Sequence, residues 1–521
     1  MTDMTIQIDL TPEQMHDLEL MRRAVAGQVG CRVDEMPPLH LVRRAIDCRR
    51  RNVVYHCIVE VGAKDVNDVS DFENIKDLKK DAKAVVIVGA GPAGLFASLR
   101  CLELGMRPII VERGKPVEKR KYDIAALARE KLVNPDSNWC FGEGGAGTYS
   151  DGKLYTRSTK RGDVSAVLRR FVAHGANPDI MLDAHAHIGT DRLGGIIANM
   201  RRSIEEHGGK YCFDSRVTDL VIRDGRVRGV RLANGDVVEG CAVVLATGHS
   251  ARDIYRMFGE HGWLLEAKPF ALGVRVEHPQ QLINEIQYHG PKYSALLPPA
   301  TYSLTTQVSG HGVFSFCMCP GGVIVPAATA DGQQVVNGMS NSRRNSPYAN
   351  SGIAVTVGLE DVLPLTSHVS PLTLLDFQQS VEQTMFHAGG DTINAPAQRL
   401  VDFLKRKSSS RIGSTGYMGD VVSAPLHDFL PPFIVDALMQ GFRDFDRKMR
   451  GFITEDATLL AVESRTSSPV RIPRDRTTMQ HPQLEGLYPC GEGAGYAGGI
   501  VSSALDGIAC IEALKKSIAA Q

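Results

Sequence analysis

The sequence predicts an α/β protein with three parts: a parallel-sheet domain encoded in two separated pieces, a mixed α/β domain inserted between them, and a small N-terminal α/β module. Strands and helices alternate with glycine-rich turns from Ala84 to about Gly248, and glycine-rich sequence returns near the C-terminus after a less regular middle. Residues 1–80 have strand and helix patterns of their own. Three domains also fit a chain of 521 residues, because one domain usually takes roughly 100–200 residues.

The N-terminal module begins with Met4–Leu10, whose alternating apolar and polar residues predict a half-buried strand. Thr11 and Pro12 are typical of a helix start. A second helix is expected from about Leu39 to Arg51, followed by a strand from Asn52 to Val61. The arginines of this second helix either form a docking surface for RNA or an acidic partner or lie on a solvated helix face, and interleaved acidic residues favour the solvated face: Arg43, Arg44, Arg49, Arg50 and Arg51.

Charge and cysteine usage exclude several classes of protein. The 59 basic and 59 acidic residues give a net charge of zero, which argues against attraction to DNA or to an anionic membrane. The 11 cysteines include no Cys-x-x-Cys pair, so we expect neither a disulfide framework nor a metal site. No secretory signal pattern and no membrane-length apolar run is present, so we expect a cytoplasmic protein.

A phosphate-binding turn follows the first strand of the parallel-sheet domain. The segment 84–94 has the sequence AVVIVGAGPAG, a buried strand followed by glycines in GxGxxG spacing and the start of a helix. These glycines permit a tight turn, close approach of the backbone to a pyrophosphate, and close packing of helix on strand. The helix N-terminus adds free N–H groups and the positive end of its dipole. A dinucleotide site is therefore predicted at Gly89, Gly91, Pro92, Ala93 and Gly94.

Two further segments extend this site. Glu112 ends the next strand, where an acidic residue can accept hydrogen bonds from a ribose diol, and Arg113 follows it. The segment 139–153, WCFGEGGAGTYSDGK, contains so many glycines that close backbone approach to a bulky ligand is expected. We expect Gly144 and Gly145 to lie against the cofactor or its pyrophosphate; the alternative is a mobile structural loop.

The C-terminal piece favours FAD over NAD. The segment 486–511 is glycine-rich, and Gly498, Gly499 and Ile500 open the last helix. The N-terminal dipole of that helix would face the flavin N1/C2=O edge, where negative charge develops on reduction. A split Rossmann-like FAD/NAD(P)-binding domain explains why the two glycine-rich pieces lie at opposite ends of the chain. The expected domains are residues 1–80, 81–267 (FAD-binding, first piece), 268–455 (inserted substrate domain) and 456–521 (FAD-binding, second piece).

The segment 210–248, with its hairpin turns at Asp224–Gly225 and Asn234–Gly235 and its final VVLATG, resembles the glutathione-reductase-type FAD domain. The resemblance implies that Val217 contacts adenine through its backbone and that Gly248 closes the last strand beside the cofactor. It also implies that Gly491 and Glu492, where the family usually has Gly-Asp, hydrogen-bond the ribityl chain.

Four longer segments resemble an uncharacterised bacterial family of FAD-dependent dehydrogenases, distantly related to geranylgeranyl reductases and aromatic hydroxylases. They are FGEGGAGTYSDGKL (141–154), ATGHSARD (246–253), FCMCPGG (316–322) and ESRTSSPVRIPRD (463–475). The resemblance covers nearly the whole chain. It implies the fold and noncovalently bound FAD, and leaves the substrate open.

Three segments are candidates for the reaction site. His249 could act as a general acid or base with its ordinary pKa near 6.5, or Ser250 or Asp253 could simply cap a helix there. Arg465 could bind a carboxylate or phosphate, or pair with Glu463. The last candidates are Cys317 and Cys319, either a redox pair or small hydrophobic residues in a strand under the flavin; we favour the second, because residues two apart in a strand are poorly placed for a disulfide.

The predicted function is an FAD-dependent oxidoreductase that transfers hydride between a small-molecule substrate and FAD. No second complete GxGxxG motif is present, so NAD(P)H, if it donates electrons, would bind transiently at the inserted domain. One alternative is a flavin-dependent RNA-modifying enzyme whose N-terminal module docks RNA. Another is a non-catalytic flavin redox sensor or assembly factor that binds a protein partner through that module.

Overall fold

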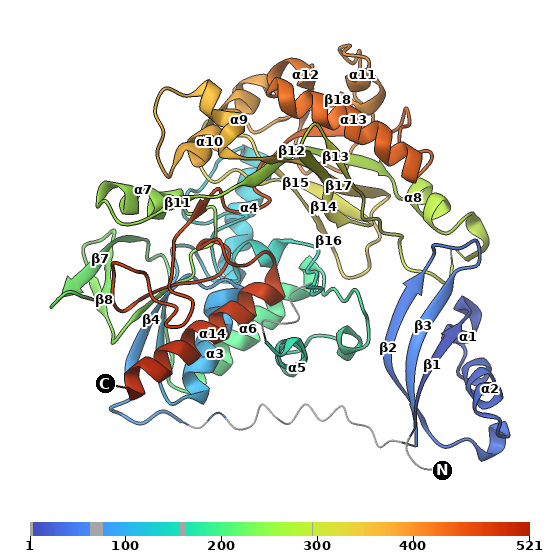
Figure 1. Ribbon diagram of the computed structural model, residues 1–521, viewed down its shortest axis with the longest axis horizontal. Coiled ribbons are helices and arrows are strands. Elements are labelled where there is room, and N and C mark those ends of the chain that lie inside the picture. Colours follow the sequence, from blue (N-terminus) through green and yellow to red (C-terminus); the bar gives the residue numbers. More distant parts are fainter. Residues whose placement is uncertain (1–3, 63–74, 76, 157–161, 294, 521) are drawn as a thin grey trace.

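The computed structural model describes residues 4–62, 75, 77–156, 162–293 and 295–520. Figure 1 shows the small N-terminal module beside a parallel-sheet domain, with the inserted domain lying over both. The predicted α/β fold is confirmed: one domain has a parallel sheet and the insert has a mixed sheet. In the described part of the chain, no helix is long and apolar enough to cross a membrane.

The N-terminal module is a three-stranded antiparallel sheet in the order β1-β3-β2, covered by two short helices. Thr11 caps the first helix, as predicted. The prediction of a helix at 39–51 was wrong, because β2 occupies this segment and pairs with β3 along its length. The elements are β1 (Met4–Leu10), α1 (Pro12–His16), α2 (Leu18–Val29), β2 (Leu39–Asp47) and β3 (Val54–Val61).

The module is attached to both other parts. His16 Nε2 lies 2.6 Å from the carbonyl oxygen of Leu296 in the insert. Arg44 Nε donates to Asp183 Oδ1 at 2.6 Å in the parallel-sheet domain. The apolar residues of the N-terminal module also belong to the same hydrophobic core as those of the insert.

The parallel sheet has the order β22-β10-β4-β5-β6, so strands from both ends of the chain pair side by side. Helices α3 and α14 pack together against it through apolar residues (Figure 1). The antiparallel β7-β8-β9 sheet follows β6, and its two predicted hairpin turns are confirmed. The strands are β4 (Ala84–Val88), β5 (Arg107–Val111), β6 (Lys210–Cys212), β7 (Val217–Arg223), β8 (Arg226–Leu232), β9 (Val237–Glu239), β10 (Val243–Leu245) and β22 (Leu487–Pro489).

This domain also contains six α-helices among its described residues. They are α3 (Pro92–Glu103), α4 (Val117–Glu130), α5 (Val164–Ala173), α6 (Thr190–Glu206), α7 (Arg252–Glu260) and α14 (Ile500–Ala519). Helix α7 begins after Ala251 without any side-chain cap, so neither Ser250 nor Asp253 caps it as the alternative supposed.

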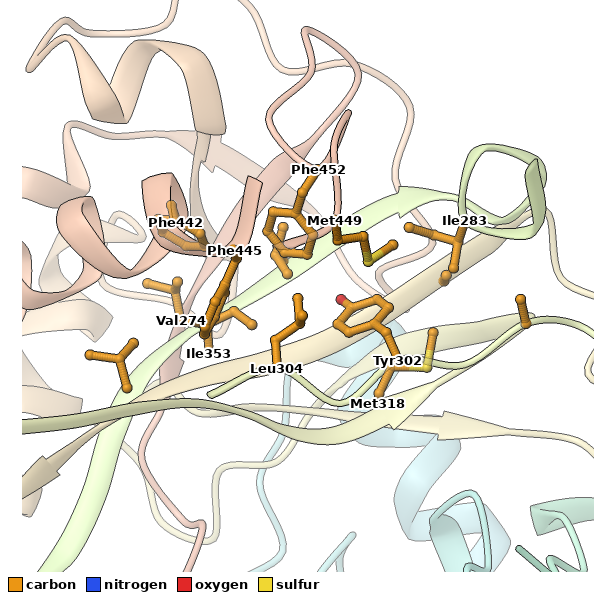
Figure 2. Close-up of a cluster of buried hydrophobic side chains, with 14 of the residues drawn as sticks. Val274, Ile283, Tyr302, Leu304, Met318, Ile353, Phe442, Phe445, Met449 and Phe452 are labelled. Carbon is orange, nitrogen blue, oxygen red and sulfur yellow. The ribbon is translucent and has the colours of Figure 1, made fainter. Parts of the chain in front are cut away.

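The insert has a seven-stranded sheet in the order β13-β14-β17-β12-β20-β18-β19. Figure 2 shows its core, where Phe442 and Phe445 of α13 pack over Val274 and Ile353 of the sheet. The strands are β12 (Phe270–Pro279), β13 (Thr305–Val308), β14 (His311–Cys319), β17 (Tyr348–Val357), β18 (Ala395–Arg399), β19 (Val421–Ser423) and β20 (Thr458–Glu463).

Helices and short strands complete the insert. The two long helices of the insert are α10 (Thr373–Ala388) and α13 (Pro432–Lys448). The rest are α8 (Gln280–Gln287), α9 (Leu359–Val362), α11 (Leu400–Leu404), α12 (Leu426–Phe429) and the ribbon β15 (Gly322–Pro326) with β16 (Val336–Ser340). The short pair β11 (Glu266–Ala267) with β21 (Val470–Arg471) joins the chain segments just before and after the insert.

Candidate functional site

Two helix N-termini from opposite ends of the chain form the centre of the site. Gly91 is the N-cap residue of α3 and Gly499 that of α14, and no side chain caps either helix. Gly89 has a φ of 104°, and a Cβ at Gly94 would overlap the carbonyl oxygen of Gly89. The turn therefore requires its glycines, and both helices leave N–H groups for a ligand.

The glycine-rich loop crosses these two helix starts. Gly144 N donates to Ala90 O at 2.8 Å. A Cβ at Gly145 would lie 3.2 Å from Gly91 Cα, and one at Gly147 would lie 3.4 Å from the Ile500 side chain. The loop thus lies against the phosphate-binding turn, and the contact of Gly144 and Gly145 with the cofactor stays a prediction.

Glu112 has a role that the sequence did not reveal. Its buried carboxylate accepts backbone hydrogen bonds from Ala90 at 2.8 Å, Gly114 at 2.9 Å and Gly142 at 3.0 Å. It therefore fixes the phosphate-binding turn to the glycine-rich loop. A carboxylate can accept about four hydrogen bonds, so capacity for a ribose hydroxyl remains.

A cavity of about 270 Å³ is lined by Arg113, the residue after Glu112, and by Arg216, the residue before Val217. Arg113 is held there by Asp136 at 2.9 Å and Asp253 at 3.0 Å, with its guanidinium 4.2 Å from the centre of the Phe141 ring. Val217 is buried at the start of the neighbouring strand β7. The cavity is lined by Arg113, Asn134, Asp136, Ser137, Asp214, Arg216 and Ala233.

The turn at Gly491, which follows strand β22, is held in place by a buried ion pair. Gly491 N donates to Asp506 Oδ2 at 2.7 Å, and Asp506 is paired with Arg474 at 2.6 Å. Among the described residues, Cys490, Asp506 and Cys510 form a group whose ligand atoms lie close enough together to hold a metal ion. Because Arg474 already neutralises Asp506, this cluster stabilises the turn without needing an ion.

Glu492 and His249 meet above the start of α14. Glu492 accepts the N–H of Gly499, and burial raises the pKa of its carboxyl. His249 Nε2 lies 3.7 Å from Glu492 Oε2. Gly248 lies against the same turn, because a Cβ at Gly493 would come within 2.6 Å of the Gly248 carbonyl oxygen. The residues predicted on the two chain pieces are thus brought together.

His249 does not have the ordinary pKa that the sequence predicted. Burial, with Arg465 and Arg252 nearby, lowers its pKa to about 4. Its Nδ1 has no hydrogen-bond partner among the described residues. At neutral pH His249 is therefore an uncharged imidazole beside the cofactor site.

Arg465 is fully engaged by protein groups. Its Nε and Nη2 reach Glu382 at 3.2 and 3.1 Å, Nη1 donates to Thr329 at 2.8 Å and to Ser250 at 3.2 Å, and Nη2 also reaches Gln333 at 3.2 Å. These contacts use the donors with which it was expected to bind substrate, so it positions the His249 segment instead. The alternative pairing of Arg465 with Glu463 was also wrong.

Glu382 of α10 is the anion that holds this region together. It is fully buried between Arg465 and Arg252, whose Nη2 lies 2.8 Å from its Oε1. Burial would raise the pKa of Glu382, but the two arginines outweigh it and lower the pKa to about 2. Glu463, in turn, pairs with the fully buried Arg275 at 2.7 Å.

A histidine titration tests this electrostatic description. By NMR, His249 is expected to stay neutral down to about pH 5, because its pKa is about 4. His56, hydrogen-bonded to Asp9 and Asp47, has a raised pKa and serves as the internal control. Since the folded-state pKa of His249 is depressed, its neutral form stabilises the protein above about pH 6.5 and this contribution is lost as the pH falls toward 4. Titration of the His249 signal near pH 6.5, identified with His249→Asn, would contradict the description.

Two family models match the chain. One, described as FAD-dependent protein, C-terminal domain-like, matches residues 269–466. The other, a domain of unknown function, matches residues 1–62. An uncharacterized protein of Clostridium beijerinckii is 39% identical over 516 residues, which cover 95% of this chain and 96% of that protein.

More distant similarities cover less or are weaker. A tRNA uridine 5-carboxymethylaminomethyl modification enzyme of Caldicellulosiruptor saccharolyticus is 28% identical over 167 residues, 32% of this chain and 24% of that protein. A flavin-dependent brominase matches with a TM-score of 0.37 and 14% identity over 84% of this chain and 80% of the brominase. A tetracycline destructase matches with a TM-score of 0.34 and 12% identity over 84% and 82%.

Proposed function

This chain belongs to a family of FAD-dependent proteins, and from that premise we propose that it is an oxidoreductase that transfers a hydride between a small-molecule substrate and noncovalently bound FAD. The observation that carries the proposal is the convergence of two uncapped helix N-termini, from α3 and α14, under one glycine-rich loop. The first suits a pyrophosphate. The second places positive charge where a reduced flavin would become negative.

Different residues of the chain would hold the different parts of the cofactor. Glu112 and the adjacent cavity would hold the adenosine half, and Gly89–Gly94 the pyrophosphate. Gly491, Glu492 and the start of α14 would hold the flavin half. When bound, the flavin supplies the hydride chemistry, while the protein orients the substrate and stabilises charge.

His249 is the residue we propose to exchange a proton with the substrate. Its neutral imidazole, with Nδ1 unpaired in the described structure, can accept a proton at neutral pH. Arg465, through Ser250, positions the segment that carries it. Burial and the charges of Arg252, Arg465 and Lys268 disfavour the protonated imidazole, while Glu382 favours it.

Anaerobic reduction of the FAD-loaded protein tests the proposal. After the flavin is reduced photochemically, or by NADH or NADPH, its reoxidation by organic acceptors is followed in the visible spectrum. For an oxidoreductase we expect at least one nicotinamide or acceptor to react much faster with the bound flavin than with free FAD. A flavin that reacts with every donor and acceptor no faster than free FAD contradicts the proposal and favours a sensor or assembly role, with a protein partner at the N-terminal module.

A second candidate is an RNA-modifying flavoenzyme, favoured by the partial similarity to the tRNA-modifying enzyme. Two of the module's arginines have acidic partners, Arg44 with Asp183 of the parallel-sheet domain and Arg49 with Asp47. We therefore expect tRNA binding to be weak. Tight binding whose affinity falls steeply with salt would favour this second function instead.

A further inference from the structure

Strand β14 is interrupted at the Cys317–Cys319 segment. Its pairing with β17 shifts register between Phe316 and Cys319, and Cys317 has a φ of 44°, in the left-handed region that a cysteine rarely adopts. This β-bulge breaks the regular alternation on which the sequence argument against a thiol pair depended. Cys319 Sγ lies 3.2 Å from the carbonyl oxygen of Cys317, so the two residues are folded tightly together.

The bulge faces the parallel-sheet domain. Met318 points into the hydrophobic core of the insert, beside Tyr302 (Figure 2). On the opposite face of the sheet, Arg275 Nη1 donates to the carbonyl oxygen of Cys317 at 3.3 Å. Lys153 Nζ, from the glycine-rich loop, donates to the carbonyl oxygen of Met318. The cysteine segment is therefore held between the insert and the loop that crosses the cofactor site.

The surroundings of Cys317 favour a thiolate. The hydrogen bond from Cys319, followed by the charges of Lys153 and Arg275, holds the pKa of the Cys317 thiol well below its ordinary range. Cys317 is partly exposed whereas Cys319 is buried, the arrangement of a reactive cysteine beside a resolving one. The charged and titratable groups that act on Cys317 or are affected by it are Lys153, Arg275, Asp151, Cys319, Glu463 and Glu492.

The glycine-rich loop connects this pair with the flavin half of the cofactor site. The loop that carries Lys153 touches Ile500 at the start of α14 through Gly147. Cys317 also acts electrostatically on Glu492, the residue that holds the Gly499 N–H. The cysteine segment and the start of α14 thus lie against the same glycine-rich loop.

We propose that Cys317 and Cys319 form a redox-active dithiol–disulfide couple that exchanges two electrons with the bound FAD. In the oxidising direction the Cys317 thiolate and the Cys319 thiol form an S–S bond, releasing two electrons and one proton. Oxidised FAD takes up the two electrons, this proton and one more from solvent. In the reverse direction reduced FAD gives two electrons and one proton to the S–S bond, which breaks to the thiolate and the thiol, and releases its second proton to solvent. The dithiol then reduces a disulfide substrate by thiol–disulfide exchange. The inference rests on the proposed function, since it needs the flavin as electron partner.

The first experiment uses the full-length protein without FAD. Each cysteine is alkylated with iodoacetamide and followed by peptide mass spectrometry. Near pH 7 an ordinary thiol is only a few per cent thiolate, so we expect Cys317 to react at least about tenfold faster than Cys48, whose pKa is raised by burial. Lys153→Met should slow alkylation of Cys317, whereas Lys119→Met, on the exposed side of α4, should not.

The second experiment counts electrons. Mild oxidation with diamide should join Cys317 and Cys319 in one peptide lighter by two hydrogens. After this oxidation, the FAD-loaded wild type should consume twice as much dithionite per flavin as Cys319→Ala, with Cys48→Ala matching the wild type.

The outcomes separate the two proposals. Equal alkylation of Cys317 and Cys48, or equal dithionite uptake by wild type and Cys319→Ala, overturns the dithiol couple. Failure to bind FAD contradicts the proposed function, whatever the alkylation rates of the FAD-free protein.

Discussion

Replacing Gly94 with alanine is expected to abolish FAD binding and to lower the free energy of unfolding by about 2–3 kcal/mol. The added Cβ would overlap the carbonyl oxygen of Gly89, which is rigid backbone and cannot move aside as a side chain would. Helix α3 must then shift away from strand β4, and its N–H groups leave the phosphate position. Urea unfolding and retention of FAD on gel filtration measure the two effects.

Gly195→Ala is the matched control for this substitution. Gly195 lies exposed within α6, with nothing within 4 Å of the added Cβ. Alanine there should stabilise the protein by up to about 1 kcal/mol through helix propensity and leave FAD binding unchanged. If Gly94→Ala binds FAD as the wild type does, the assignment of this turn to the pyrophosphate is wrong.

Replacing Glu382 with alanine is expected to cost about 3–5 kcal/mol of stability, the usual effect of removing one partner of a buried ion pair. Arg252 and Arg465 would both remain buried without their shared anion. The segment of His249 and Ser250 would lose its support, so turnover should fall together with stability. Asp376→Asn is the control on the same helix: its pair with Arg256 is largely exposed, and the loss should stay within about 1 kcal/mol.

The Glu382→Gln variant keeps the shape of the side chain but removes its charge, so its stability as a function of pH isolates the effect of the charge. Because the folded-state pKa of Glu382 is lowered to about 2 from 4.5, its ionised form stabilises the wild type above about pH 4.5, and that contribution is lost as the pH falls toward 2. The glutamine variant should therefore be less stable at neutral pH and lack this part of the acid-induced loss. Parallel stability profiles for the two proteins would show that Glu382 does not hold the arginines as described.

Much of the cofactor site could be predicted because its signals are local. The turn at Gly89–Gly94 and the start of the last helix at Gly498–Ile500 each follow from backbone requirements written in a few consecutive residues. That the two pieces share one sheet followed from the glycine-rich character of both ends of the chain. The structure places these predicted positions around one site.

The missed features depend on partners distant in sequence. The arginine-rich segment 39–47 is a strand because β3 supplies backbone partners along its length and Asp183 pairs with Arg44. The pKa of His249 depends on Arg252 and Arg465, and the hydrogen-bond partners of Arg465 come from three separate segments of the chain. No local pattern encodes such contacts. The bulge at Cys317, likewise, appears only once β14 pairs with β17.

The most direct test of the account is the amount of FAD that the folded protein retains. Purified protein is incubated with FAD, separated from free cofactor by gel filtration, and examined by visible absorbance before and after denaturation. The account predicts one FAD per chain, bound with the visible bands of an oxidised flavin and released intact on unfolding. Folded protein that retains no flavin after this treatment would contradict the central claim.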